Sequence, residues 1–356
     1  RDSGAPRGVS PAGRQVMFYT FLKNPAAETL LGHSLELMAR EIGKMPECSG
    51  VRAVVLGGGY GRGEGGATPE GALCNDLDFF VIPHDGISAD SLQSAFRHLG
   101  RKWKEILSID VDFFIVPAFQ WLIRNEKTLM VQELLAGNRI IYGDSSVLSG
   151  VPRLQWRELP WREGARLLLN RGTGLLLSRR RMQNPEEKEF IRRNLHKAAL
   201  GCGDALLIAH HAYRKTGMER LDSLRDTGVS EELSSFYKTA LRYKYSPFMP
   251  EAEDLPESLH DMTTLWNATV CVFSHTVTGC NNANTADAVS ALLHCRKENS
   301  GSFLRNTLLS LRYPGSKLLP LREHPRLKLL GSLAAVLNTP DRQAEDRYLK
   351  LWRRFN

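Results

Sequence analysis

The chain has 356 residues, of which 42% are hydrophobic and 24% are charged. This composition is typical of a folded protein and excludes collagen-like, mucin-like and wholly disordered chains. The length predicts two domains. Every apolar run is interrupted by a charge, a glycine or a proline well before about eighteen residues, so no membrane span is predicted.

The charge is divided unevenly along the chain. Residues 1–150 hold 15 Lys/Arg and 17 Asp/Glu, a net charge of −2, whereas residues 151–356 hold 32 and 22, a net charge of +10. An anionic partner, whether nucleic acid, nucleotide phosphates or an acidic protein face, is therefore expected to meet the second part first. A basic surface that is only exposed to water explains the same distribution.

The sequence carries no sign of export. Its six cysteines are scattered without a Cys-x-x-Cys pair, so reduced thiols in a cytoplasmic protein are expected rather than disulfides or a zinc site. Residues 1–14 lack an apolar core segment, and we predict a mobile tail over residues 1–20 rather than a signal peptide.

The first half begins with alternating helical and strand patterns. After Asn24-Pro25, a cap followed by proline, apolar residues recur at helical spacing and predict a helix to about Met45. The apolar runs 51–56 and 77–82 predict strands, the first of which stops at glycines. Ser88 opens a further predicted helix, with the apolar stripe Leu92, Phe96, Leu99, Trp103 and Ile106.

Residues 109–116 predict a third strand, which Pro117 ends. One helix to about residue 136 and a short strand over 139–142 follow. Strands and helices interleave, so the first domain, residues 21–150, is predicted to be a mixed sheet flanked by helices.

Long helical patterns replace strand patterns from residue 151 onward. The clearest helix carries one apolar stripe from Leu195 to Ala209. Residues 245–256 predict a loop, helices resume near Met262, and residues 342–354 predict a basic amphipathic helix. The predicted fold class is therefore α+β, with an all-α C-terminal domain over residues 151–356.

Three features of the first domain suggest chemistry. A glycine-rich turn, residues 57–66, directly follows a strand, and such turns let backbone N–H groups approach an anion. The segment Asn75-Asp76-Leu77-Asp78 opens the next strand, and Asp110-Val111-Asp112 lies in the strand after it.

The carboxylates of an Asp-x-Asp pair on a strand project from one face, because side chains alternate with period two. Carboxylates so close together repel one another, and a hard divalent cation removes that cost. With a third carboxylate from a neighbouring strand, the pattern predicts a site for one or two Mg²⁺ ions and hence phosphoryl or nucleotidyl transfer.

Two competing phosphate-binding motifs are excluded. Residues 61–66 match the dinucleotide-binding pattern Gly-x-Gly-x-x-Gly, but only residues 67–75 separate them from the next Asp-x-Asp strand. That segment contains Pro69 and Gly71 and is too short for the helix of a βαβ unit. No Gly-Lys-Ser/Thr follows the turn, which excludes a Walker A loop.

A strand, a glycine turn with Arg-Gly-Glu, Asp-x-Asp on a strand, a helix and an Asp-containing strand resemble the DNA polymerase β-type nucleotidyltransferase superfamily. The nearer likeness is to bacterial nucleotidyltransferases with a helical C-terminal domain. The resemblance covers about residues 50–145. It departs from the family pattern at Gly58-Gly59, where Gly-Ser is usual, and in the longer segment between Gly59 and Asp76.

The resemblance implies roles for individual residues. Asp76, Asp78 and Asp112 would be the metal ligands and catalytic carboxylates, with Asp110 as the alternative to Asp112. Asp112 would also take the proton of the acceptor hydroxyl. The residues implied to hold the nucleotide phosphates are Gly58, Gly59 and Arg62. Glu64 is expected to be structural, either pairing with Arg62 or capping a helix.

The activity implied is Mg²⁺-dependent transfer of a nucleoside monophosphate, with ATP as the expected donor, onto a hydroxyl of a small molecule, a protein or RNA, with release of pyrophosphate. The alternative is a nucleotide- or RNA-binding protein of the same fold that no longer catalyses. Several basic residues of the second domain either reach the nucleotide or an acidic acceptor, or form a solvated basic face: Arg162, Arg166, Arg171, the run Arg179-Arg180-Arg181, and Arg192, Arg193 and Lys197 on the long predicted helix. His196, His210 and His211 are expected to be structural.

Overall fold

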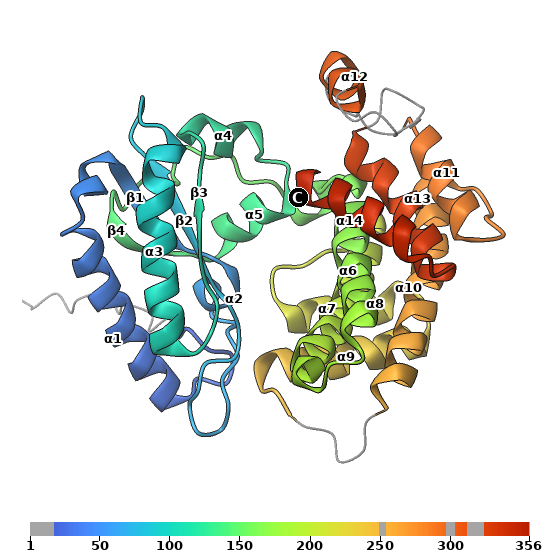
Figure 1. The fold of residues 1–356 in the computed structure, drawn as a ribbon, viewed down its shortest axis with the longest axis horizontal. Coiled ribbons are helices and arrows are strands. Elements are labelled where there is room, and N and C mark those ends of the chain that lie inside the picture. Colours follow the sequence, from blue (N-terminus) through green and yellow to red (C-terminus); the bar gives the residue numbers. More distant parts are fainter. Residues whose placement is uncertain (1–17, 249–253, 297–302, 312–323, 356) are drawn as a thin grey trace, which may run out of the picture.

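The computed structural model describes residues 18–248, 254–296, 303–311 and 324–355. The chain folds into two lobes that lie side by side (Figure 1), one built on a four-stranded sheet and one built of helices. Within the described ranges, strands lie only before residue 144, and helices are the regular structure after it. The architecture is therefore α+β, as predicted.

The sheet has the strand order β3-β2-β1-β4. The central strand β1 (Val51–Leu56) is antiparallel to both β2 (Leu77–Pro83) and β4 (Arg139–Gly143). The edge strand β3 (Val111–Ile115) is parallel to β2, and α3 (Ala89–Leu107) makes the crossover that a parallel pair requires. All four predicted strands form, with ends within two residues of the prediction.

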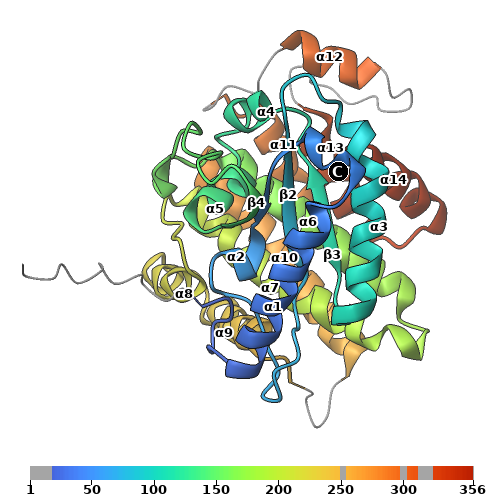
Figure 2. The same ribbon diagram turned by 90° about the vertical axis from the view of Figure 1, so that its left-hand side faces the viewer.

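Helices cover both faces of this sheet. On one face α1 (Pro25–Ile42) and α3 bury their apolar stripes, and in Figure 2 these two helices are in the foreground. The short helices α4 (Phe119–Arg124) and α5 (Leu129–Ala136) pack on the other face. The predicted caps are confirmed, because Asn24 accepts the N–H groups of Ala26 and Ala27, and Ser88 accepts that of Asp90.

The prediction of one helix before residue 136 is wrong, since α4 and α5 are separate helices. The polar run between them explains the break. Asn125 ends α4, and Thr128 begins α5 by accepting a hydrogen bond from the N–H of Val131. A threonine N-cap of this kind starts a new helix rather than continuing an old one.

The predicted tail is too long at its C-terminal end. Thr20 is only 1% exposed, and it forms a β-bridge with Gly65. The Tyr19 and Thr20 N–H groups also donate to the carboxylate of Glu28. These contacts hold residues 18–20 against the first lobe, while the rest of the predicted tail, residues 1–17, lies outside the described residues.

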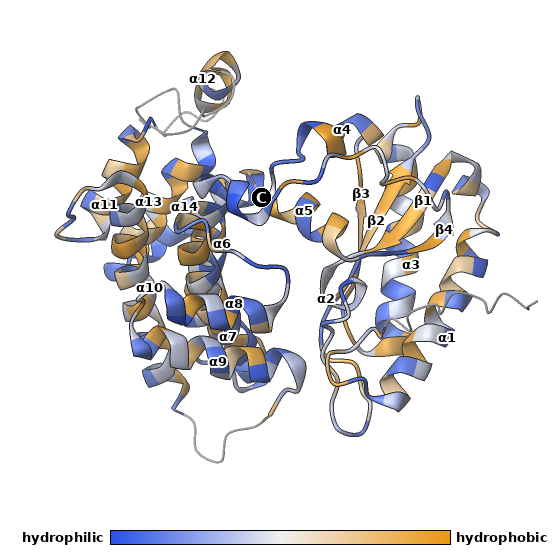
Figure 3. Ribbon diagram, turned by 180° about the vertical axis from the view of Figure 1, so that it is seen from behind, coloured by the Kyte–Doolittle hydropathy of each residue, from blue (hydrophilic) through white to orange (hydrophobic). Residues whose placement is uncertain are grey.

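The helical lobe is centred on two long helices, α6 (Trp161–Arg181) and α7 (Lys188–Ala209), whose apolar faces meet in one core. Around them pack α8 (Gly217–Asp226), α9 (Glu231–Tyr245), α10 (Leu255–Thr278), α11 (Thr285–His294), α12 (Phe303–Leu311), α13 (Pro325–Asn338) and α14 (Arg342–Phe355). Figure 3 shows both hydrophobic and hydrophilic residues along these helices, whereas β1 and β2 are largely hydrophobic.

One helix of this lobe begins earlier than predicted. The helix α10 starts at Leu255 rather than near Met262, because Asp254 caps it and Pro256 occupies its first turn. The predicted loop therefore shortens to the segment between Tyr245 and Asp254, and residues 249–253 within it lie outside the described residues.

The six cysteines are all free. Among the helices that the structure describes, none combines the length and the apolar character needed to cross a bilayer.

Candidate active site

The register of β2 and β3 places two carboxylates side by side. Asp78 pairs with Asp112 in this parallel ladder. Leu77 and Phe79 point into the core beneath α1 and α3, so Asp78 projects from the opposite face. Residues in register on adjacent strands share a face and lie about 4.8 Å apart along the hydrogen-bonding direction. The pairing of the two strands alone therefore makes these carboxylates neighbours.

Both carboxyl groups resist ionisation. The pKa of Asp78 is raised to about 6, first by desolvation between the walls of the site and then by the charges of Asp76 and Asp112. The side chain of Asp78 is still open to the water of a cavity. Burial and the charges of Asp110 and Asp76 raise the pKa of Asp112 as well. This pair has the charge and the donor atoms that a hard cation prefers.

Asp76 lies one pleat before Asp78 but has other partners. Its Oδ1 is 2.6 Å from Nη2 of Arg193, and its Oδ2 is 3.3 Å from Nζ of Lys197. Desolvation opposes ionisation of Asp76, but Lys197 and Arg193 outweigh it, so the pKa of this carboxyl is lowered. Asp76 is therefore a salt-bridge partner of α7.

Asp110 is separated from the carboxylate pair. It precedes β3, and its carboxylate is 2.5 Å from Nζ of Lys104 on α3. Both side chains are exposed. The structure thus places Asp112, rather than Asp110, beside Asp78.

The glycine turn lies against the same carboxylate. The Gly57 N–H donates to the backbone carbonyl of Asp78 at 2.8 Å, and the four-residue helix α2 (Gly58–Gly61) follows. Gly58 has φ of +58°, and a Cβ at this position would lie 2.1 Å from Oδ2 of Asp78. Both its backbone conformation and its contact therefore require glycine. Gly58 and Gly59 line a cavity together with Asp76 and Asp78.

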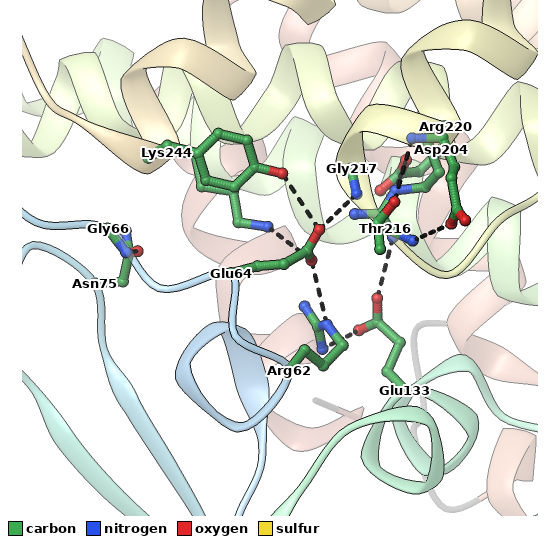
Figure 4. Close-up of polar contacts among 12 residues, drawn as sticks. Arg62, Glu64, Gly66, Asn75, Glu133, Asp204, Thr216, Gly217, Arg220 and Lys244 are labelled. Carbon is green, nitrogen blue, oxygen red and sulfur yellow. Dashed lines mark hydrogen bonds and ion pairs between the residues drawn. The ribbon is translucent and has the colours of Figure 1, made fainter. Parts of the chain in front are cut away.

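The long segment between the turn and β2 is tied back by side chains. The Tyr60 hydroxyl donates to the carbonyl of Gly66 at 2.8 Å and accepts the N–H of Cys74 at 3.1 Å. The Gly66 N–H donates to Oδ1 of Asn75 at 2.5 Å (Figure 4). These bonds fix the approach to Asp76. No sequence pattern predicted these roles of Tyr60 and Asn75.

Arg62 belongs to a buried ion-pair network between the lobes (Figure 4). Its guanidinium is 3.5 Å from Glu64 and 3.3 Å from Glu133, and its side chain is 9% exposed. Glu64 also accepts the Gly217 N–H at 2.6 Å and lies 3.7 Å from Nζ of Lys244. Glu64 thus pairs with Arg62, as expected, whereas the predicted phosphate ligand Arg62 has its guanidinium held by two carboxylates.

The same network extends into the helical lobe. Arg220 is 3.4 Å from Glu133 and 3.3 Å from Asp204, and only 4% of its side chain is exposed. Desolvation disfavours the ionised form of Glu64, but Lys244, Arg220 and Arg62 outweigh it and lower the pKa of Glu64 to about 2. Three cations, Arg62, Arg220 and Lys244, are therefore matched by three carboxylates. Sequence reasoning missed this network, although Asp204 interrupts an otherwise uncharged helical run.

Two cavities meet at Asp78. The first, of about 410 Å³, lies between the glycine turn and α6 and α7, and Asp76 lines it. The second, of about 370 Å³, reaches Asp112 and has the apolar side chains Phe80, Phe114, Met130 and Leu134 in its wall. Gly58 and Asp78 line both.

Ring systems occupy one end of the first cavity. His196 stacks on Tyr243 with ring centroids 4.0 Å apart. Burial, together with the nearby Arg192 charge, lowers the pKa of His196 to about 4, so this imidazole is neutral near pH 7. Both residues line the cavity and offer flat surfaces for an aromatic ligand.

The fit of these residues to a divalent cation is incomplete in this arrangement. Among the residues that the structure describes, no three His, Cys, Asp or Glu side chains are grouped to hold a metal. Asp78 and Asp112 present adjacent carboxylates, whereas the oxygens of Asp76 contact Arg193 and Lys197. The carboxylate pair fits a cation, and Asp76 joins it only by leaving its basic partners.

No family model matches the chain, and no curated protein and no solved structure shows significant similarity to it.

Proposed function

We propose that the protein is a Mg²⁺-dependent nucleotidyltransferase that transfers the nucleoside monophosphate of an NTP, with ATP as the expected donor, onto a hydroxyl group. One observation carries this proposal. Asp78 and Asp112 lie side by side on adjacent strands at the junction of two cavities, and the first of these cavities has a basic opposite wall. The resemblance of residues 50–145 to polymerase β-type nucleotidyltransferases agrees with it.

The two cavities suggest separate places for the two substrates. The triphosphate fits the first cavity, between Gly58-Gly59 and the cations of α6 and α7, with the base near His196. The acceptor fits the second cavity, because Asp112 lies there and Asp76 does not. Its apolar wall favours an acceptor that carries a hydrophobic part beside the reacting hydroxyl.

The residues then have distinct tasks. Asp78 and Asp112, later joined by Asp76, would hold Mg²⁺, which would neutralise phosphate charge when bound. Asp112 accepts the proton of the acceptor hydroxyl. The hydroxyl oxygen forms a bond to the α-phosphorus, the bond from that phosphorus to the bridging oxygen breaks, and pyrophosphate leaves. The basic wall stabilises the leaving charge.

A specific observation favours the alternative, a nucleotide-binding protein without catalysis. Asp76 is engaged with Arg193 and Lys197 rather than with the carboxylate pair. A protein that kept this arrangement would bind a nucleotide and release no pyrophosphate.

The test uses ATP labelled at the α-phosphate, Mg²⁺ and a bacterial extract as a pool of acceptors. We expect label to move from ATP to an acceptor with the wild-type protein. Asp78→Asn and Asp112→Asn should each reduce the transfer at least about 100-fold, because each removes a charge that acts in the transition state.

Asp110→Asn is the matched control. It makes the same chemical change two residues from Asp112, at a carboxylate that pairs with Lys104 outside the junction. Transfer by this variant should stay near the wild-type rate. If the wild-type protein binds ATP but transfers no label, the alternative replaces the enzyme.

A further inference from the structure

Three cations of the first cavity wall lie outside the buried network between the lobes. The buried network between the lobes is balanced, since Arg62, Arg220 and Lys244 face Glu64, Glu133 and Asp204. The remaining cations of the cavity wall are Arg171, Arg193 and Lys197, and among the described residues Asp76 is the carboxylate that makes salt bridges with them. Asp78 and Glu189 also line the cavity, but Glu189 pairs with Arg192. Three cations therefore share one directly bound carboxylate.

Arg171 is the unmatched member of this group. It projects from α6 into the cavity, and in the described part of the chain no hydrogen bond or ion pair is found for its guanidinium. Desolvation lowers the pKa of Arg171, and the charges of Asp204, Glu133 and Asp76 offset this only in part, so the folded protein holds this cation at a cost. A half-buried guanidinium without a direct ion pair is a strong site for an anion.

The helix opposite makes room for this arginine. A Cβ at Gly201 would lie 2.3 Å from Cγ of Arg171, so only glycine lets the side chain pass across α7. Arg193, Lys197 and Gly201 follow one another at four-residue spacing and therefore share one face of α7. The face that admits Arg171 is the face that carries the other two cations.

We infer that Arg171, Arg193 and Lys197 form a polyphosphate-binding subsite, and that the carboxylate of Asp76 competes with the polyphosphate for Arg193 and Lys197. When the polyphosphate binds, its phosphates contact Arg193 and Lys197 in place of the carboxylate of Asp76. This exchange frees the carboxylate of Asp76 to lie beside Asp78. The inference rests on the proposed function for the identity of the ligand, a nucleoside triphosphate. This exchange explains why Asp76 contacts Arg193 and Lys197 rather than lying with Asp78 and Asp112.

The test is calorimetric titration of the whole protein with inorganic tripolyphosphate in EDTA, without magnesium. Asp76→Asn should bind tripolyphosphate about 5- to 30-fold more tightly than the wild-type protein, because it removes the carboxylate that competes for two cations. Loss of a carboxylate that only supports the fold would not strengthen anion binding. This direction separates the exchange from a purely structural role.

Arg171→Gln should weaken tripolyphosphate binding at least about tenfold, since it removes a charge-assisted contact. Arg171→Lys, which keeps the charge, should retain part of the affinity. Arg181→Gln is the matched control, because Arg181 lies on the same helix, pairs with Glu187 and does not line this cavity. The affinity of Arg181→Gln for tripolyphosphate should equal that of the wild-type protein.

If Arg171→Gln fails to fold, Lys197→Gln introduced into the Asp76→Asn protein takes its place and should bind less tightly than Asp76→Asn alone. Equal or weaker binding by Asp76→Asn overturns the exchange, and unchanged binding by the cation variants overturns the subsite. Tripolyphosphate binding as expected without nucleotidyl transfer would refute the proposed function alone.

Discussion

The carboxylate of Asp78 carries its charge where the surroundings oppose ionisation. Its pKa is raised to about 6 from the ordinary 3.8, with desolvation as the largest cause. A carboxyl with a folded-state pKa above its unfolded value binds its proton more tightly when folded. Its contribution to stability is therefore full below about pH 4 and is lost as the pH rises through about 6.

Replacing this charge should stabilise the ligand-free protein. At pH 7.5 we expect Asp78→Asn to gain about 1 kcal/mol, after allowance for screening by cavity water, and to raise the Tm by about 2 °C. The gain should shrink as the pH is lowered towards 4, where the wild-type carboxyl is protonated. Thermal melts across this pH range measure it.

Asp110→Asn serves again as the control, because its carboxylate is exposed and pairs with Lys104. Its Tm should stay close to that of the wild-type protein at each pH. A lower Tm for Asp78→Asn at pH 7.5 would mean that the charge of Asp78 supports the fold rather than strains it.

Among the elements, α8 makes a buried charged contact that joins it to both lobes. Arg220 on this helix contacts Glu133 of α5 and Asp204 of α7. Removal of one partner from a buried ion-pair network leaves the others charged without compensation. Arg220→Leu should therefore lower the free energy of unfolding by about 3–5 kcal/mol, as measured by urea denaturation.

Arg225→Leu makes the same change on the same helix at an exposed pair with Asp222. It should cost less than about 1 kcal/mol. Similar losses for the two variants would show that the network adds nothing beyond a surface ion pair.

The sequence predicted the individual helices and strands better than it predicted the contacts between them. Strand ends at the glycine turn and at Pro117, and the caps Asn24 and Ser88, are local signals that agree with the structure. The break between α4 and α5 was not predicted, because a short polar run fits a helix surface as well as a turn. The caps decide such cases only when their hydrogen bonds are seen.

The sequence predicted the carboxylates of the candidate site but not the residues that contact them from the helical lobe. Strand periodicity put Asp110 and Asp112 on one face and left both open as the third carboxylate, and the family resemblance favoured Asp112, which the structure places in register with Asp78. The partners of Asp76 lie 117 and 121 residues away, on a helix whose pattern alone fits a solvated basic face. Pairing with Arg62 was one of the two roles predicted for Glu64, whereas the second partner of Arg62, Glu133, comes from another element.

At the scale of the whole molecule, the two lobes are joined by contacts whose loss would destabilise the protein. Glu64 of the first lobe accepts the N–H of Gly217 in the second, and the rings of Phe21 and Tyr245 stack at 3.7 Å. We expect the two lobes to unfold together, because separation would leave charged groups of both without partners. Scanning calorimetry should then show a single heat-absorption peak.

A second peak, with the first lobe melting apart from the helices, would contradict this expectation. The control is Arg181→Gln, which removes an ion pair within the helical lobe and should leave a single peak. Glu64→Gln, which weakens the contact to Lys244, should broaden that peak or divide it.

The parallel pairing of β2 and β3 has a consequence for how this site tolerates change. The separation of Asp78 and Asp112 is a repeat distance of the hydrogen-bonded ladder, and the register of these strands is continuous. Substitutions in the core beneath the strands would alter stability and leave that distance untouched. An inserted residue within β2 or β3 would instead move one carboxylate to the opposite face of the sheet. The site should thus tolerate substitutions in the core beneath the strands but not insertions within β2 or β3.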